Sequence, residues 1–306
     1  MFFSYFIRKE KNMNHVKQLV HAEKVYQMGL TGKNVRIALL DTGAYRHPDI
    51  RSNVIYFKDY VNNRKESYDD NGHGTHILGI LCGNGSASDG RIMGMAPKAE
   101  VMVFKILDNE GNGKTSDALD ALDWILENHK RYNLKLLNFS MGYVPYANQV
   151  IQQKLLEKLD LLWEDGVTIV TAAGNNGPER NSITVPGISR NVITVGSSEE
   201  SKYTTKLLSG YSGRGPTSCC IVKPEVLAPG TDVLSTSNRG VMYEKKSGTS
   251  MSAPIVTGAL ALAYEKYPKL TPVVAKLLLY DSVDRIKNNQ NPSWGILNVD
   301  KLIEML

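Results

Sequence analysis

Short apolar runs alternate with longer amphipathic stretches along much of the chain. Five apolar runs have the length and composition of buried strands: 35–40, 101–106, 134–139, 167–172 and 192–195. Apolar residues recur at helical spacing over three stretches, 117–130, 149–165 and 250–267, and Thr271-Pro272 marks the start of another helix. Strands that alternate with helices are typical of a parallel sheet covered by helices on both faces. The pattern therefore predicts an α/β fold with a mostly parallel β-sheet.

The organisation of the chain favours a single domain. We find no internal repeat, low-complexity tract or linker that divides it. Residues 1–19 are expected to form a short N-terminal extension, and residues 20–306 the domain itself. The apolar start at residues 1–7 precedes its basic charges, the reverse of a secretory signal, and Met13 is an alternative start.

Composition narrows the possible partners. The chain has 306 residues, 42% hydrophobic and 22% charged, which is ordinary for a folded protein. It has no apolar stretch approaching the roughly 20 residues of a membrane-spanning helix, so we expect no membrane partner. The net charge of +5 is spread along the sequence, which does not favour nucleic acid.

The number and spacing of the cysteines indicate the cellular compartment. Of the three cysteines, Cys219 and Cys220 are neighbours and rarely form a comfortable bridge, so no disulfide framework is indicated. A reducing compartment fits this usage. We expect a cytoplasmic protein and leave open export without a leader.

Three polar segments follow predicted strands. They are Asp41, the loop after Phe139, and residues 173–175. In parallel sheets, ligands gather at the carboxyl ends of the strands. We therefore expect these segments to meet at one edge of the sheet.

Candidate chemistry lies in Asp41-Thr-Gly, Asn71-Gly-His-Gly-Thr-His and Ser247-Gly-Thr-Ser-Met-Ser-Ala-Pro. A serine hydroxyl is a weak nucleophile until a base takes its proton, and imidazole suits that task near neutral pH. The imidazole needs a carboxylate on its other nitrogen to fix the tautomer and stabilise the charged form. Asp41, His73 and Ser250 supply these three parts, weak signals singly but strong together.

Five blocks carry a family resemblance. Residues 35–43, 70–81, 137–142, 171–175 and 248–254 resemble the signature blocks of the subtilisin-like serine proteases. The resemblance covers roughly residues 20–285, with the organisation of the intracellular bacterial members that carry little propeptide. It implies a subtilisin-like fold and a serine endopeptidase that acts through an acyl-enzyme.

The resemblance also assigns roles. It implies that Ser250 is the nucleophile, His73 the general base and then acid, and Asp41 the orienting carboxylate. Asn175 would donate its side-chain amide to the oxyanion, beside the backbone N–H of Ser250.

In this family the substrate adds as a strand between two enzyme segments. The matching residues here are Gly111, Asn112 and Gly113 on one side and Ser140, Met141 and Gly142 on the other. Ala172, Ala173 and Gly174 would form one wall of the pocket for the residue before the cleaved bond, with Thr184 and Val185 at its base. This uncharged pocket predicts peptides or unfolded segments with apolar or medium-sized residues there.

The chemistry requires no cofactor. Asp49 falls where some relatives bind calcium, but the loop at residues 82–90 differs from theirs, so Asp49 is a weak candidate for a structural Ca²⁺ ion. His76 follows His73 at zinc-binding spacing, yet neither an intervening Glu nor a third ligand is evident, which favours a structural histidine.

Three alternatives stay open. A dedicated maturation protease for one peptide would have the same sequence features. A peptide-binding pseudoprotease is disfavoured because the triad and Asn175 are all present. An aspartic protease built on Asp41-Thr-Gly needs a second carboxylate, and Asp89, the comparable residue, lacks a preceding apolar strand. The sequence does not predict the oligomeric state.

Overall fold

The structure of the protein is a computed structural model that describes residues 12–142, 149–198, 210–217, 220–286 and 293–306. Eight of its strands form one sheet in the order β10-β7-β6-β5-β4-β1-β3-β2, and all neighbouring strands in it are parallel. In chain order these strands are β1 (Arg36–Asp41), β2 (Val54–Asp59), β3 (Glu100–Lys105), β4 (Leu134–Phe139), β5 (Thr168–Ala172), β6 (Ile193–Ser198), β7 (Val226–Pro229) and β10 (Gly295–Ile296). The predicted single-domain α/β fold is confirmed.

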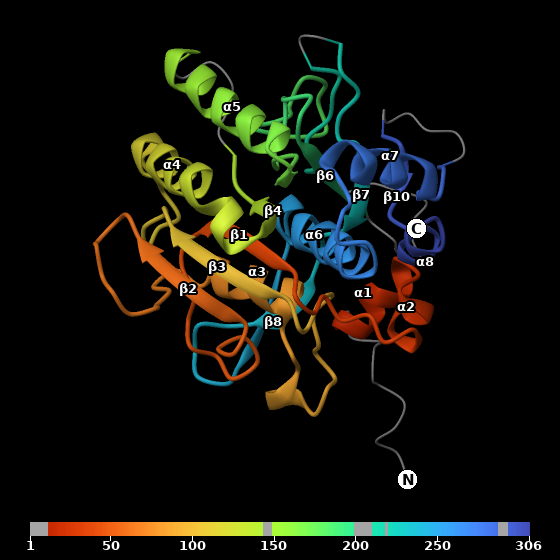
Figure 1. Cartoon of the computed structure of the whole chain (residues 1–306), viewed down its shortest axis with the longest axis horizontal. Helices are drawn as coiled ribbons and strands as arrows, with labels where there is room; N and C mark the ends of the chain where they lie inside the picture. The colour runs from red at the N-terminus through yellow and green to blue at the C-terminus, as the bar shows by residue number, and fades with distance from the viewer. Residues whose placement is uncertain (1–11, 143–148, 199–209, 218–219, 287–292) are drawn as a thin grey trace.

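Helices pack against this sheet in two groups (Figure 1). The helices are α1 (Met13–Leu19), α2 (Glu23–Gln27), α3 (His73–Cys82), α4 (Thr115–Tyr132), α5 (Gln149–Glu164), α6 (Thr249–Lys266), α7 (Pro272–Ser282) and α8 (Val299–Glu304), with a 3₁₀ turn at Ser86–Ser88. Helices α4 and α5 lie side by side, against β1 and β4 and against β5 respectively. Helices α3 and α6 pack on each other, and α6 also crosses β4 to β7. A small antiparallel hairpin of β8 (Val233–Thr236) and β9 (Tyr243–Lys246) packs on α3 through β8.

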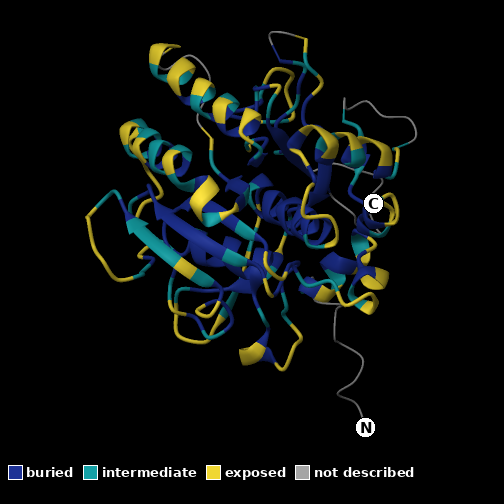
Figure 2. Cartoon of the chain, in the orientation of Figure 1, coloured by how far each residue is buried: buried dark blue, intermediate teal, exposed yellow. Residues whose placement is uncertain are grey.

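Helix α6 is buried over most of its length, whereas the outer helices α4 and α5 each expose one face (Figure 2). Fifteen residues of α6 are buried, so the helix is covered on all sides by the sheet, α3 and α8. Small side chains such as Ala253, Gly258 and Ala261 allow this close packing. Helix α4 buries only one stripe, which includes Leu122 and Ile125, as expected for an amphipathic helix at the surface.

Helix α1 differs from the sequence expectation. Residues 13–19 belong to the segment we expected to be an extension, yet they form a helix whose Met13 and Val16 are buried in the core. Asn12 caps it by accepting a hydrogen bond from the N–H of His15 at 3.1 Å. Seven residues give too short a pattern to be recognised in sequence. Residues 1–11 of the expected extension lie outside the described residues.

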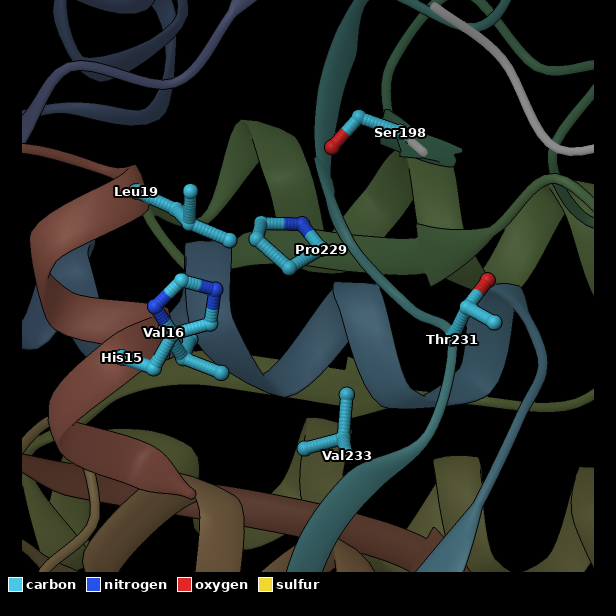
Figure 3. A pocket seen from close by; sticks show the side chains of 7 residues that line it. All are labelled: His15, Val16, Leu19, Ser198, Pro229, Thr231 and Val233. Atoms are coloured by element: carbon cyan, nitrogen blue, oxygen red, sulfur yellow. The ribbon is translucent and has the colours of Figure 1, made fainter. Parts of the chain in front are cut away.

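The seam under α1 is shown in Figure 3, where Val16 and Leu19 lie near Pro229 and Val233. The hollow between them measures about 10 Å³, which is room for about one water molecule. It is therefore a packing seam rather than a ligand site. None of the helices within the described ranges is both long enough and apolar enough to cross a membrane.

Candidate active site

Asp41 ends β1, in the middle of the sheet between β3 and β4, and is fully buried. One carboxylate oxygen, Oδ1, accepts hydrogen bonds from the Thr42 N–H and from His73 Nδ1, both at 2.7 Å. The sheet thus fixes the carboxylate, and the carboxylate fixes which ring nitrogen of His73 carries a proton. Its outer nitrogen, Nε2, remains for a reacting group.

The first residue of α3 is His73, and the buried carboxylate of Asp69 shapes the loop that leads to it. Asp69 Oδ1 accepts from the Gly72 N–H at 2.8 Å and from Thr42 Oγ1 at 2.9 Å. Its other oxygen accepts from the N–H and the hydroxyl of Thr75, at 2.9 and 2.6 Å. One carboxylate therefore ties the turn after Asp41 to the start of the His73 helix.

The charges around His73 favour its protonated form. Burial by itself would lower the pKa of His73, but the charge and hydrogen bond of Asp41 outweigh burial and raise the pKa above its ordinary value. Lys246 acts in the lowering direction and Asp69 in the raising direction. Such an imidazole can take up a proton during a reaction and hold it.

Ser250 is the second residue of α6 and half-buried, and it lines the same cleft as His73. The preceding Gly248 has a φ of 151°, which strongly favours glycine, and a Cβ there would lie 3.2 Å from Asn175 Nδ2. The unpaired N–H groups at the start of a helix attract negative charge. Ser250 therefore lies where an oxyanion formed beside it would be stabilised.

Asn175 is oriented by Thr249. Its Oδ1 accepts hydrogen bonds from the Thr249 N–H at 3.0 Å and from the Thr249 hydroxyl at 3.1 Å. Two donors on one side of the amide identify that side as the oxygen, and the –NH₂ group is left to donate elsewhere. Asn175 is exposed in the cleft, so this donor is available to a bound molecule.

The cleft that joins these groups has a volume of about 430 Å³. Residues from all the predicted substrate segments line it, namely Gly111, Ser140, Met141, Gly142, Ala172 and Gly174, together with Glu110, Asn176 and Thr184. Asn112, Gly113, Ala173 and Val185 adjoin these residues in the chain but are not part of the lining. The predicted segments therefore meet at one cleft.

Thr184 lies between the two walls of this cleft and is 3% exposed. A Cβ added to Gly142 would overlap its Oγ1, and one added to Gly174 would overlap its Cγ2. The missing side chains of these two glycines thus make room for Thr184. This placement agrees with its expected position at the base of the pocket.

Asp49, the calcium candidate, is fully buried. Its Oδ1 accepts hydrogen bonds from Ser86 Oγ at 3.2 Å and the Ala87 N–H at 2.7 Å, and its Oδ2 accepts from the Tyr243 hydroxyl at 2.7 Å. Calcium needs six to eight oxygen ligands, whereas these partners are hydrogen-bond donors. The described residues also contain no group of three His, Cys, Asp or Glu side chains placed to hold a metal. The residues around Asp49 therefore do not fit the ion.

His76 supports the helix instead of a metal. Its Nε2 lies 3.1 Å from the carbonyl oxygens of both Val233 and Glu244 in the hairpin. Burial lowers the pKa of His76 to about 3, so the ring is neutral at ordinary pH. This is the structural role that the sequence favoured.

Sequence reasoning missed the partners that hold the triad in place. Thr42 and Thr75 lie inside recognised blocks and Lys105 lies between two of them, but a hydroxyl or ammonium shows its partner only in three dimensions. The one signal available was a Lys at the end of a buried apolar strand, which is unusual because buried lysines need partners.

Comparisons with known proteins identify the family of the chain. The model of the "Subtilase family" of peptidases matches residues 32–295. The chain belongs to the subtilase family. It is therefore a serine protease, a hydrolase.

Individual relatives cover most of this subtilase. Serine protease AprX of Bacillus subtilis (strain 168) is 35% identical over 298 residues, 90% of this chain and 67% of AprX. Subtilisin DY of Bacillus licheniformis is 30% identical over 285 residues, 92% of this chain and 95% of that protein. Among solved structures, the S41 Psychrophilic Protease has a TM-score of 0.78 at 29% identity, over 88% of this chain and 92% of its own. Sphericase has a TM-score of 0.77 at 28% identity, over the same 88% and 92%.

Proposed function

We propose that this subtilase hydrolyses internal peptide bonds through an acyl-enzyme formed on Ser250. The observation that carries the proposal is the 2.7 Å contact between Asp41 and His73 at a cleft that Ser250 also lines. That contact uses Nδ1 of His73, so its other nitrogen, Nε2, is the one left for a reacting group. An aspartate, an imidazole and a serine in this arrangement make an activated nucleophile.

The reaction proceeds in two halves. Ser250 Oγ attacks the peptide carbonyl while His73 Nε2 takes the hydroxyl proton, and Asp41 stabilises the imidazolium that forms. The Asn175 amide and the Ser250 N–H bind the negative oxygen of the tetrahedral intermediate. His73 then gives its proton to the leaving amine, and water attacks the acyl-Ser250 ester by the same route in reverse.

The proposed substrate is an extended peptide or an unfolded protein segment. It would add as a strand between residues 111–113 and 140–142, where the glycines allow the backbones to come close. The walls at residues 172–174 and the floor at Thr184 carry no charge. We therefore propose uncharged residues, apolar or medium-sized, before the cleaved bond.

Two further parts of the proposal concern the location of the protein and its partners. We propose a cytoplasmic location, supported by the free thiols of Cys82 and Cys220, and neither nucleic acid nor membrane as a partner. Processing of one dedicated peptide is the narrower version of the same activity, because the cleft would be equally suited to it. The peptide-binding pseudoprotease stands as the outcome opposed to cleavage.

A peptide library tests this proposal. We expect the wild-type chain to cleave peptides with Leu, Met, Ala or Gln before the bond at least tenfold faster than peptides with Lys or Arg there, since a charge gains no partner in this pocket. Ser250→Ala should cleave none of them. A preference for Lys or Arg would contradict the proposed pocket, and binding without cleavage would favour the pseudoprotease.

A further inference from the structure

Lys105, the last residue of β3, has a fully buried side chain beside the active site. Its Nζ donates hydrogen bonds to the Thr42 carbonyl at 2.6 Å, to the Leu107 carbonyl at 2.7 Å and to Asp70 Oδ1 at 2.7 Å. An ammonium has three N–H groups, so all three are used. Because a buried charge is tolerated only when it is paired and fully hydrogen-bonded, these surroundings are built for the cation.

The three acceptors belong to three different parts of the active site. Thr42 directly follows the triad residue Asp41. Asp70 lies in the loop three residues before His73. Leu107 lines the cleft ahead of Gly111. One ammonium therefore joins the orienting carboxylate, the loop that carries the base and a segment that borders the substrate.

Lys105 also faces the triad strand directly. Asp41 and Lys105 are register partners in the neighbouring parallel strands β1 and β3, and partners in register project their side chains to the same face of a sheet. Asp41 Oδ2 is buried and has no hydrogen-bond partner among the residues that the structure describes. The register therefore places the buried ammonium of Lys105 in the strand next to this carboxylate, on the same face of the sheet.

We propose that Lys105 is a positioning residue for the triad, a role that rests on the proposed function. It holds three segments of the site together and supplies the countercharge for Asp41 and Asp70. The charged groups that face His73 are Asp41 from β1, Asp69 from the preceding loop and Lys246 from β9. Lys105 acts behind them, because it sets where Asp41 lies and neutralises Asp70.

Loss of the ammonium changes the charge balance around His73. In Lys105→Met, of similar length but uncharged, the carboxylates of Asp41 and Asp70 lose their counterion, so the imidazolium becomes more favourable. We expect the pKa of His73 to rise. Asp70→Asn removes negative charge and should lower it, and the double variant should return it toward the wild-type value.

A matched control exists at the far side of the sheet. Lys223 is also fully buried, and its Nζ donates to the Val192 carbonyl, Thr194 Oγ1 and Glu225 Oε1 at 3.1, 2.9 and 2.7 Å. Its partners belong to β6, β7 and their flanks, with β5 and β4 between them and β1. Lys223→Met therefore removes a similar buried ammonium without touching the triad.

The experiment is an NMR titration of the His73 imidazole in the full chain, assigned with His73→Gln, on the wild type and the four variants. This readout does not depend on peptide cleavage, so failure of this inference is distinguishable from failure of the proposed function. We expect a raised pKa of His73 in Lys105→Met and a lowered one in Asp70→Asn. We expect kcat/KM on the best library peptide to fall about tenfold or more in Lys105→Met and to stay unchanged in folded Lys223→Met.

Two results would overturn the role. One is an unchanged pKa of His73 in both Lys105→Met and Asp70→Asn. The other is a loss of activity in Lys105→Met that is fully explained by its loss of thermal stability, with Lys223→Met losing as much activity for the same loss of stability. If Lys105→Met does not fold, Asp70→Asn decides alone: a lowered pKa of His73 supports the role, and an unchanged one overturns it.

Discussion

At the scale of single residues, the side chain of Asn175 is already held in one orientation by its contacts with Thr249. Thr249 occupies the amide oxygen with two hydrogen bonds, and Asn175 lines the same cleft as Ser250. A donor that is already oriented loses little freedom when charge develops on the substrate oxygen. Asn175 should therefore act on the transition state more than on the bound substrate.

Asn175→Ala tests this directly. We expect kcat to fall about 100- to 1000-fold with little change in KM, as measured for an oxyanion donor of subtilisin. Asn176→Ala is the matched control, since Asn176 also lines the cleft and is exposed, but no hydrogen bond to Thr249 orients it among the described residues. A loss of less than tenfold in kcat for Asn175→Ala would remove Asn175 from the oxyanion site.

The candidate site residues were predictable because each lies in a distinctive local pattern, such as Asp41 after a buried strand and His73 among glycines. Their supports were not. The Asp69 carboxylate accepts from Thr42, 27 positions away, and Lys105 reaches Asp70 across 35 positions. Such pairings cannot be predicted from a linear sequence, because many polar residues along the chain are equally suitable partners for a carboxylate or an ammonium.

At the scale of elements, the β8–β9 hairpin holds the helix that begins with His73. Ser235 Oγ donates to the His76 carbonyl at 2.8 Å, and Thr236 Oγ1 donates to the Thr75 carbonyl at 2.7 Å. His76 Nε2 lies 3.1 Å from hairpin carbonyls in return. These contacts fix α3, and with it His73, against the β8–β9 hairpin.

The neutral ring of His76 makes stability depend on pH. The pKa of His76 is lowered from 6.5 to about 3 in the folded chain. Between these two pH values, His76 binds a proton in the unfolded state but not in the folded state. The free energy of unfolding should fall as pH drops from 6.5 toward 3, by up to about 1.4 kcal/mol per unit from this group.

Urea unfolding at pH 7, 5 and 4 measures this effect. His76→Gln should be less stable at pH 7, because it loses the hairpin contacts, but its free energy of unfolding should fall less steeply below pH 6.5. The carboxylates titrate in both chains and cancel in the comparison. Equal slopes in the two chains would show that His76 is protonated in the folded state.

Elements whose apolar residues follow a regular strand or helix pattern were predicted well. Strand β4 has the expected bounds, and α5 and α6 lie within a residue of theirs. Strand β2 was missed because it lies at the sheet edge with Ile55 exposed, which mixes its pattern. Strands β7 to β10 have four residues or fewer, too short for a periodic signal. Helix α4 also begins earlier than expected, at Thr115 rather than at residue 117.

At the scale of the whole molecule, parallel strands bring the site together. Strands β1, β4 and β5 are neighbours that run in the same direction, so their carboxyl ends deliver Asp41, residues 140–142 and residues 173–175 to one edge. This convergence follows from strand order and was predictable. The packing of α1 on β8 depends on contacts between distant segments and was not.

Labelling with a serine-directed fluorophosphonate is the most direct test of the central claim, that Asp41 and His73 activate Ser250. The account predicts rapid labelling of the wild-type chain at Ser250, none in Ser250→Ala, and labelling at least about 100-fold slower in His73→Ala. A folded wild-type chain that stays unlabelled, or equal labelling of wild type and Ser250→Ala, would contradict it.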